Sequence, residues 1–235
     1  VKHAEQEADV ILWDGGNNDF PFLSPDLHIV LVDPLRPGNE DSHHPGEAVL
    51  RMADIIVVAK VNSASDSDVE EVTEAARAIN ASAPIVRAMS PVSAEKPDLI
   101  RGRRVLVIED GPSVTHGGMP YGAGYVAAAA AQAAEIVDPR AAAVGEIAEV
   151  YARYPHIGAV LPAVGYHPAQ LRALQATINP VSADFVVMAT PCDLSELLSI
   201  DQPVVRVLYE FAEAGEPGLG SLIEGFLLRT GLVRD

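Results

Sequence analysis

Several residue types are scarce in this sequence of 235 residues, and each scarcity excludes a class of protein. A single cysteine, Cys192, excludes an internal disulfide framework and a cysteine-rich zinc site. It also favours a reducing, cytoplasmic compartment. No apolar run approaches the roughly 18 residues that predict a membrane helix, and no signal-peptide pattern opens the chain. We therefore expect no membrane partner.

Positive charge is scarce as well. Sixteen lysines and arginines oppose 33 aspartates and glutamates, which gives a formal net charge of −17. A charge of this size repels nucleic acid, so we expect no nucleic-acid partner. A small anionic substrate remains compatible with it, because a few arginines and helix amino termini can form a local positive pocket.

Apolar runs rich in β-branched residues recur along the chain and alternate with helical or loop segments. Such runs are typical of strands in a mainly parallel sheet with helices on both faces, so the predicted fold class is α/β. The expected strands are Asp9–Trp13, Leu27–Asp33, Asp54–Lys60, Pro84–Met89, Arg104–Glu109, Ile157–Leu161, Phe185–Thr190 and Val204–Tyr209. The expected helices are Asp68–Asn80, Tyr121–Ala134, Gly145–Tyr154, Pro168–Ile178 and Ser221–Thr230.

Proline, serine and glycine interrupt the periodic pattern between Ser90 and Gly102. We therefore expect a first domain over residues 1–100 and a second α/β domain over residues 101–235. Residues 1–7 have the composition of a helix end that leads directly into a strand. This opening predicts that the chain is part of a longer protein.

The first expected strand runs into an acidic, glycine-rich loop, residues 14–19. Ligands of open α/β sheets bind beyond the carboxyl ends of the strands. An apolar strand that ends in Asp is also the Walker-B arrangement, in which Asp14 would hold Mg²⁺ beside nucleotide phosphates. Gly15, Gly16 and Asn17 would let the backbone approach the nucleotide. The alternative is a tight turn at a strand exit.

The next two expected strands also end in polar loops. After the first of them, Arg36 is a candidate phosphate ligand. After the second, the run from Ala59 to Asn62 has the position of the Asn-Lys-x-Asp motif with which GTPases read guanine, with Ala59 in place of Asn and Asn62 in place of Asp. Lys60 would pack along a base, with Asn62 near it, but an amide lacks the paired acceptors that select guanine. An ordinary polar strand exit is the alternative.

The richest loop follows the expected strand Arg104–Glu109 and leads to an alanine-rich helix. Asp110 would hold a metal or orient a donor, and His116 would bind phosphate or move a proton. Gly117 and Gly118 would offer backbone N–H groups to a phosphate, as would the start of the helix. Five glycines in one crossover cost conformational entropy, which favours a functional loop over a purely structural one.

Four further polar side chains are weaker candidates. Arg140 would grip a phosphate through two hydrogen bonds, with a surface ion pair as the alternative. The neighbouring His43 and His44 fit an exposed polar loop better than a metal site. Cys192 has no partnered base in the sequence around it, so a packing or capping role is favoured over a nucleophile.

Four blocks of sequence together resemble cyclic 2,3-diphosphoglycerate synthetase and its bacterial relatives. The resemblance covers nearly the whole chain, and it lies in Ala8–Phe22, Arg51–Asp54, Val105–Ala127 and Tyr154–Gly158. It implies a P-loop NTPase-like first domain related to the GTPases. It also implies an enzyme that uses ATP and Mg²⁺ to close a phosphoanhydride within 2,3-bisphosphoglycerate, with release of ADP and phosphate.

By this resemblance, Asp14 is the Mg²⁺-linked catalytic residue, Lys60 and Asn62 lie near the base, and the loop from Asp110 to Gly124 belongs to the acceptor or phosphate site. One departure is that the chain has no G-x-x-x-x-G-K-[ST] segment, which the family carries upstream of the Asp14 strand. The expected partners are therefore a nucleotide, a small phosphorylated substrate and the upstream P-loop segment of the same protein, with a homodimer also considered.

Two other functions stay open from the sequence. One is a GTPase-like switch or metallochaperone, in which hydrolysis drives the binding of a partner. The other is a non-catalytic binding domain whose nucleotide site has decayed.

Overall fold

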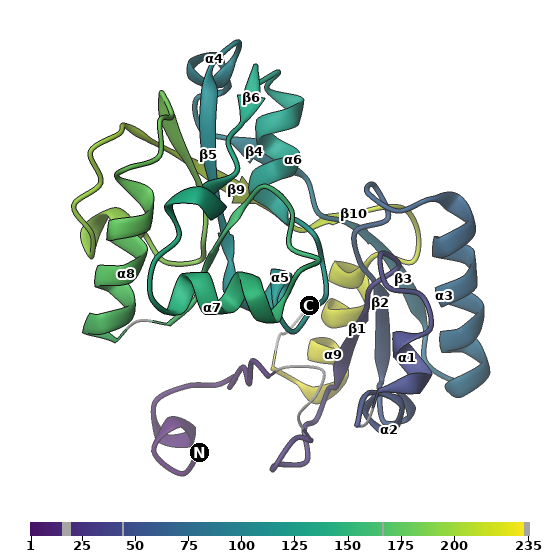
Figure 1. The fold of residues 1–235 in the computed structure, drawn as a ribbon. Helices are drawn as coiled ribbons and strands as arrows, with labels where there is room; N and C mark the ends of the chain where they lie inside the picture. Colours follow the sequence, from purple (N-terminus) through teal and green to yellow (C-terminus); the bar gives the residue numbers. More distant parts are fainter. Residues whose placement is uncertain (16–19, 44, 166, 233–235) are drawn as a thin grey trace. The chain divides into compact units, whose positions relative to one another are not determined.

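The computed structural model describes residues 1–15, 20–43, 45–165 and 167–232. The fold is α/β, with mostly parallel sheets flanked by helices, as predicted (Figure 1). The chain forms two compact units, of which unit 1 comprises Val1–Pro91 with Glu210–Asp235 and unit 2 comprises Val92–Tyr209. The change from unit 1 to unit 2 falls at the amino-terminal end of the predicted Ser90–Gly102 boundary. The predicted division assigned all residues after 100 to the second domain, whereas the chain returns to unit 1 at Glu210.

Unit 1 holds a four-stranded sheet in the order β1-β2-β3-β10. The three parallel strands are β1 (Ile29–Val32), β2 (Ile55–Val58) and β3 (Ile85–Met89), and β10 (Ala212–Glu213) runs antiparallel to β3. The helices are α1 (Asn39–Ser42), α2 (Gly46–Arg51), α3 (Asp66–Ile79) and α9 (Leu219–Thr230), with a short 3-10 helix over Ala4–Gln6.

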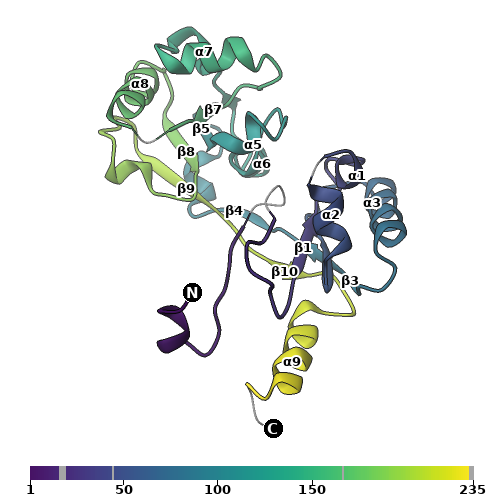
Figure 2. The ribbon, with the colours of Figure 1, turned by 90° about the horizontal axis from the view of Figure 1, so that it is seen from below.

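Both faces of this sheet are apolar, and helices cover each of them (Figure 2). Val30, Val32, Ile56 and Val58 pack against α2 and α3, since successive strand residues point to opposite faces. Helix α3 begins at the side-chain cap that Ser65 gives to the N–H of Asp68. The other face, which includes Ile55 and Val57, packs against Leu219 and Leu222 of α9.

Unit 2 holds a six-stranded sheet in the order β4-β9-β8-β5, with β6 and β7 both paired to β5. Its strands are β4 (Val92–Ala94), β5 (Arg104–Asp110), β6 (Glu135–Ile136), β7 (Leu161–Ala163), β8 (Phe185–Ala189) and β9 (Val204–Tyr209). Its helices are α4 (Pro97–Ile100), α5 (Gly111–Val114), α6 (Ala123–Ala130), α7 (Glu146–Arg153) and α8 (Pro168–Ile178), with 3-10 helices over Pro139–Ala142 and Leu194–Glu196. Helices α6 and α8 lie on opposite faces of the sheet (Figure 2).

Strand β5 is central to unit 2, because residues 105–109 are all buried and β8 pairs with it on one side. The chain leaves β5, places β7 on the other side, and then crosses back to form β8. Such a reversal of direction marks the crevice at which open α/β sheets bind ligands, beyond the carboxyl ends of the two strands. Here those ends are Asp110 and Ala189.

Two predicted strands differ from the structure. Asp9–Trp13 is not a strand in the structure, because it pairs with none of the described strands and its apolar side chains are exposed. Most of Ile157–Leu161 is irregular, because Arg140 binds the carbonyls of Ile157 and Gly158 that a strand would give to a neighbour. The described residues hold no helix that is both long and apolar enough to cross a membrane.

Candidate functional site

The carboxyl ends of β1 and β2 in unit 1 bring a carboxylate and two cations together. Asp33 follows β1 directly, and its Oδ2 accepts hydrogen bonds from Lys60 Nζ at 2.7 Å and from the Arg36 guanidinium at 2.9 Å. Its Oδ1 accepts from the N–H of Leu35 at 3.1 Å. We name Asp33, Arg36 and Lys60 the ion cluster. Sequence reasoning named the two cations but missed Asp33, although its position directly after an expected strand was a signal.

The ion cluster is net positive in a chain of net charge −17. Burial alone would raise the pKa of Asp33, but the hydrogen bond and charge of Lys60, together with Leu35 and Arg36, lower that pKa overall. Asp33 is therefore an anion at neutral pH, and two cations share it. The side chains of Lys60 and Arg36 are 41% and 36% exposed, so both can also be reached by an anionic ligand.

Lys60 and Asn62 hold the loop after β2 in a fixed shape. Lys60 has a φ of 54°, in the left-handed region that few side chains adopt. Asn62 accepts from the N–H of Ser90 at 2.8 Å and donates to its carbonyl at 3.4 Å. The Asn62 amide thus joins the loop to the exit of β3, and its place near a base stays a prediction.

The predicted Mg²⁺ residue Asp14 is exposed and does not end a strand, since Asp9–Trp13 forms none. Gly15 is exposed beside it, close to the Trp13 ring. Gly16 and Asn17 lie outside the described residues, as does His44. The described residues contain no grouping of three or more His, Cys, Asp or Glu side chains that could hold a metal ion. The assignment of Asp14 to Mg²⁺ stays a prediction.

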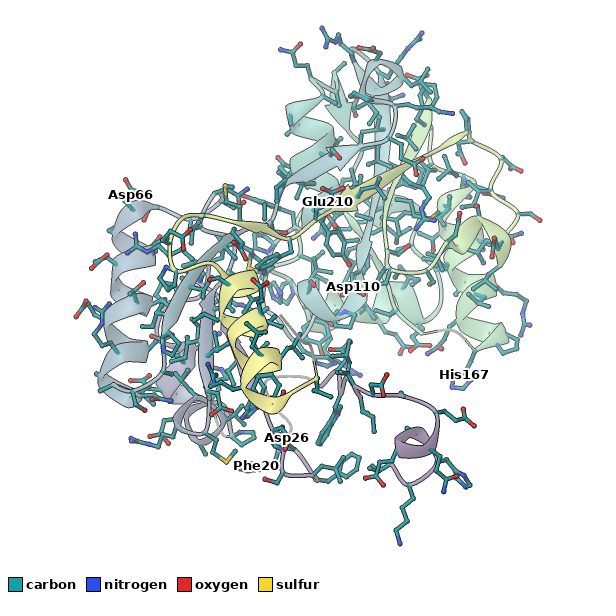
Figure 3. The ribbon with its side chains drawn as sticks, turned by 180° about the vertical axis from the view of Figure 1, so that it is seen from behind. Phe20, Asp26, Asp66, Asp110, His167 and Glu210 are labelled. Atoms are coloured by element: carbon teal, nitrogen blue, oxygen red, sulfur yellow. The ribbon has the colours of Figure 1, made fainter. Side chains whose placement is uncertain are left out.

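The carboxyl end of β5 carries Asp110, which is half-buried and accepts a hydrogen bond from Ser113 Oγ at 3.3 Å. Figure 3 labels Asp110 where β5 passes into α5. Beyond the adjacent β8, Thr190 donates to the carbonyl of Cys192. Cys192 is half-buried in this turn. A half-exposed carboxylate at the crossover crevice can bind a cation or accept a proton from a substrate amine.

Glu109, one residue earlier, is buried and holds the loop that follows. Its Oε1 accepts from the N–H groups of Gly122 at 2.9 Å and Tyr125 at 2.8 Å, and its Oε2 accepts from that of Gly124 at 3.1 Å. Burial raises the pKa of Glu109 despite these three hydrogen bonds. The sequence predicted free N–H groups at the start of α6. The structure gives them to Glu109, which sequence reasoning missed although an acidic residue ended an otherwise apolar run.

The same contacts explain two of the glycines in this crossover. A Cβ on Gly122 would lie 2.7 Å from Glu109 Oε2, and a Cβ on Gly124 would lie 2.7 Å from Val107 Cγ1. Both positions therefore need glycine for close packing. Gly117 and Gly118, predicted to bind phosphate, donate their N–H groups to the carbonyls of Pro112 and Thr115.

His116 is exposed, and its Nδ1 lies 3.3 Å from the hydroxyl of Tyr154. Their rings meet edge to face at 5.9 Å, and the Tyr154 ring meets His156 in the same way at 6.0 Å. His156 Nε2 lies 2.9 Å from the carbonyl of Val114. The structure thus places His116 in a small aromatic cluster that joins the loop after β5 to the loop before β7.

Arg140 is bound to groups of its own unit. It pairs with Asp138 at 2.7 Å, donates to the carbonyls of Ile157 and Gly158, and lies 4.8 Å from the centre of the Tyr151 ring. These contacts give Arg140 a structural role, and phosphate binding by it stays a prediction. In unit 1, His43 is exposed and its Nδ1 lies 3.0 Å from Ser42 Oγ.

Comparison with known proteins shows similarity to a named synthetase. No family model matches the chain. The arginine synthetase ArcE of Thermococcus kodakarensis is 52% identical over 224 residues, which is 95% of this chain and 50% of the relative. The chain therefore spans about half the length of the curated relative it matches. This relative is named as a synthetase, as is the enzyme family that the sequence resembles. The compound in its name is arginine, whereas the resemblance implied cyclic 2,3-diphosphoglycerate.

Proposed function

We propose that this chain is part of an ATP-dependent ligase that forms a nitrogen-containing product of the arginine type. The observation that carries the proposal is the 52% identity to a named arginine synthetase over 95% of the chain. The fold supports it, because each parallel sheet presents charged side chains beyond its carboxyl ends, where α/β enzymes bind ligands.

The ion cluster is the proposed contact with the nucleotide phosphates. Lys60 and Arg36 both donate to one carboxylate oxygen, and a phosphate oxygen is an acceptor of the same kind. Mg²⁺ would accompany the nucleotide, with Asp14 as its proposed protein ligand and the remaining positions filled by phosphate oxygens and water. A P-loop segment elsewhere in the complete protein would supply further N–H groups to the phosphates.

Asp110 is the proposed contact with the second substrate. Its carboxylate lies at the crossover crevice of unit 2 and suits a cationic or amine-bearing substrate. A ligase that builds a guanidino group must activate a carbonyl oxygen by transfer of a phosphoryl group from ATP. A nitrogen nucleophile then displaces phosphate, so that ADP and phosphate are released.

The state of the predicted phosphate ligand favours this substrate class over 2,3-bisphosphoglycerate, whose two phosphates each carry about −1.5 to −2 at neutral pH and need cations to bind them. That ligand, Arg140, is already held by Asp138 and by two backbone carbonyls. Closure of a cyclic phosphoanhydride in 2,3-bisphosphoglycerate remains the second candidate reaction, because four blocks of sequence resemble that family.

The test uses the complete protein that contains this chain. It is incubated with ATP, Mg²⁺, ammonium and the ureido amino acid that lacks one guanidino nitrogen of arginine, and arginine and ADP are measured by mass spectrometry. We expect equal amounts of the two products, and loss of both in Asp110→Asn. Turnover of 2,3-bisphosphoglycerate instead would support the second candidate. A calorimetric preference for GTP, with neither product formed, would support a GTPase-like switch and overturn the proposal.

A further inference from the structure

Four consecutive apolar residues near the amino terminus of unit 1 are exposed. Val10, Ile11, Leu12 and Trp13 are 50%, 43%, 91% and 39% exposed. The Trp13 ring packs against Phe22, with centroids 4.3 Å apart, and Phe22 is itself 79% exposed. We name Val10–Trp13 and Phe22 the apolar patch. Contiguous exposed apolar residues of this kind mark surfaces that another polypeptide covers.

The composition of Val10–Trp13 defines what kind of surface covers it. Alternate residues of a strand point to opposite faces, so four apolar residues in a row are typical of a strand buried on both faces inside a parallel sheet. None of the described strands pairs with this segment. Burial of both faces needs a sheet with packed elements around the added strand, which a larger body of structure supplies more readily than a strand pair between two copies.

The relative at 52% identity is about twice as long as this chain, so half of its length has no counterpart here. We propose that the equivalent half of the complete protein contributes a β-strand that pairs with Val10–Trp13 and buries the apolar patch. This inference rests on the proposed function, because it assumes that the chain is part of a longer ligase with a second half. It also places Asp14 at the end of a paired strand, where a carboxylate could be held beside a ligand.

Trp13 gives a direct test, because it is the single tryptophan of this sequence. The fluorescence of the complete protein is compared with that of its Trp13→Phe variant, and the difference spectrum isolates Trp13. We expect blue-shifted emission and weak quenching by acrylamide. Hydrogen exchange should show protected amides over residues 10–13. Red-shifted emission with unprotected amides in the complete protein would overturn the proposal.

A matched pair of variants tests the packing. Leu12→Asp should lower the Tm of the complete protein by about 5 °C or more, whereas Leu197→Asp, at a residue 52% exposed in unit 2, should leave it nearly unchanged. Equal, small effects of both variants would count against burial of the patch. Protection that appears only as the protein dimerises on concentration would assign the patch to a second copy. These measurements do not depend on catalysis, so a failure of the strand-pairing proposal can be told apart from a failure of the proposed ligase activity.

Discussion

The ammonium group of Lys60 lies 2.7 Å from Oδ2 of Asp33, and this ion pair joins the ends of two neighbouring parallel strands. Arg36 reaches the same oxygen from its own loop. Together the three side chains of the ion cluster leave a net positive charge at the sheet edge of a strongly acidic protein. The proposed contact of unit 1 with the nucleotide phosphates rests on this cluster.

Removal of the Lys60 ammonium should weaken ATP binding. In the complete protein, Lys60→Ala should raise the Kd for ATP by about tenfold, which corresponds to the loss of about 1.4 kcal/mol from one charge-assisted contact. Isothermal calorimetry measures the change. Lys2→Ala removes the same charge from an exposed residue in unit 1 and should leave the Kd within twofold. Equal effects of the two variants would mean that only net charge matters.

Loss of the Asp33 carboxylate should destabilise unit 1 modestly. Asp33→Asn removes the anion shared by two partly exposed cations, at an expected cost of about 1 kcal/mol. Because the pKa of Asp33 is lowered in the folded state, its contribution is complete above its ordinary pKa of 3.8 and is lost as pH falls through the folded value. The free energy of unfolding, measured by denaturant titration, should therefore change less between pH 7 and pH 3 in the variant than in the wild type. An unchanged pH dependence would contradict this role.

Glu109 should make unit 2 less stable as pH rises. Burial raises its pKa above the ordinary value of 4.5, so the folded unit binds more protons than the unfolded chain just above that pH. Stability then falls as pH rises through this window, until the folded pKa is passed. Hydrogen exchange of β5 amides between pH 4.5 and 8, corrected for the intrinsic exchange rate, should show this fall in the wild type and not in Glu109→Gln.

Glu109→Gln should also lower stability at neutral pH by about 1–3 kcal/mol. Its amide NH₂ cannot accept a hydrogen bond, so at least one of the three N–H donors of Gly122, Gly124 and Tyr125 loses its partner. Glu149→Gln, at an exposed residue of α7, is the control and should change stability by less than about 0.5 kcal/mol. If Glu109→Gln left the free energy of unfolding unchanged, water would have replaced the carboxylate as the hydrogen-bond acceptor.

Arg140 should contribute to stability in unit 2. Arg140→Ala removes its bonds to the carbonyls of Ile157 and Gly158 and its contact with Tyr151, at an expected cost of about 2–3 kcal/mol. Arg153→Ala, at an exposed residue of α7, should cost much less. Thermal unfolding measures both variants. If Arg140→Ala instead kept its Tm and lost phosphate affinity, the predicted phosphate-binding role would be right.

Two glycine-to-alanine changes should have opposite effects. In α6, the Cβ of Gly124→Ala would lie 2.7 Å from Val107 Cγ1 and 3.0 Å from Ala189 Cβ, so we expect destabilisation of about 1–3 kcal/mol. In α9, the Cβ of Gly225→Ala would meet only the flexible Arg229 guanidinium at 3.4 Å, so better helix propensity should stabilise by about 0.5–1 kcal/mol. Chemical denaturation of each variant checks the signs.

The sequence by itself determined the α/β class and most of its elements, because these depend on local periodicity. Strands β1, β2, β3, β5, β8 and β9 and helices α3, α6, α7, α8 and α9 lie within or close to the expected ranges. The two-residue strands β6 and β10 have no periodic signal, since they are set by the neighbour each one pairs with. The return of the chain to unit 1 at Glu210 likewise depends on which surface α9 covers.

Only the tertiary structure decided which polar groups meet. The sequence identified Lys60 and Arg36 but could not show that both share Asp33, because Lys60 lies 27 positions from Asp33 and on the next strand exit. It identified the glycine-rich loop after β5 but not that buried Glu109 takes the N–H groups at the start of α6. It predicted a strand at Asp9–Trp13 from apolar composition, and no described strand pairs with that segment. Hydrogen bonding and burial depend on partners distant in sequence, so local pattern alone does not determine them.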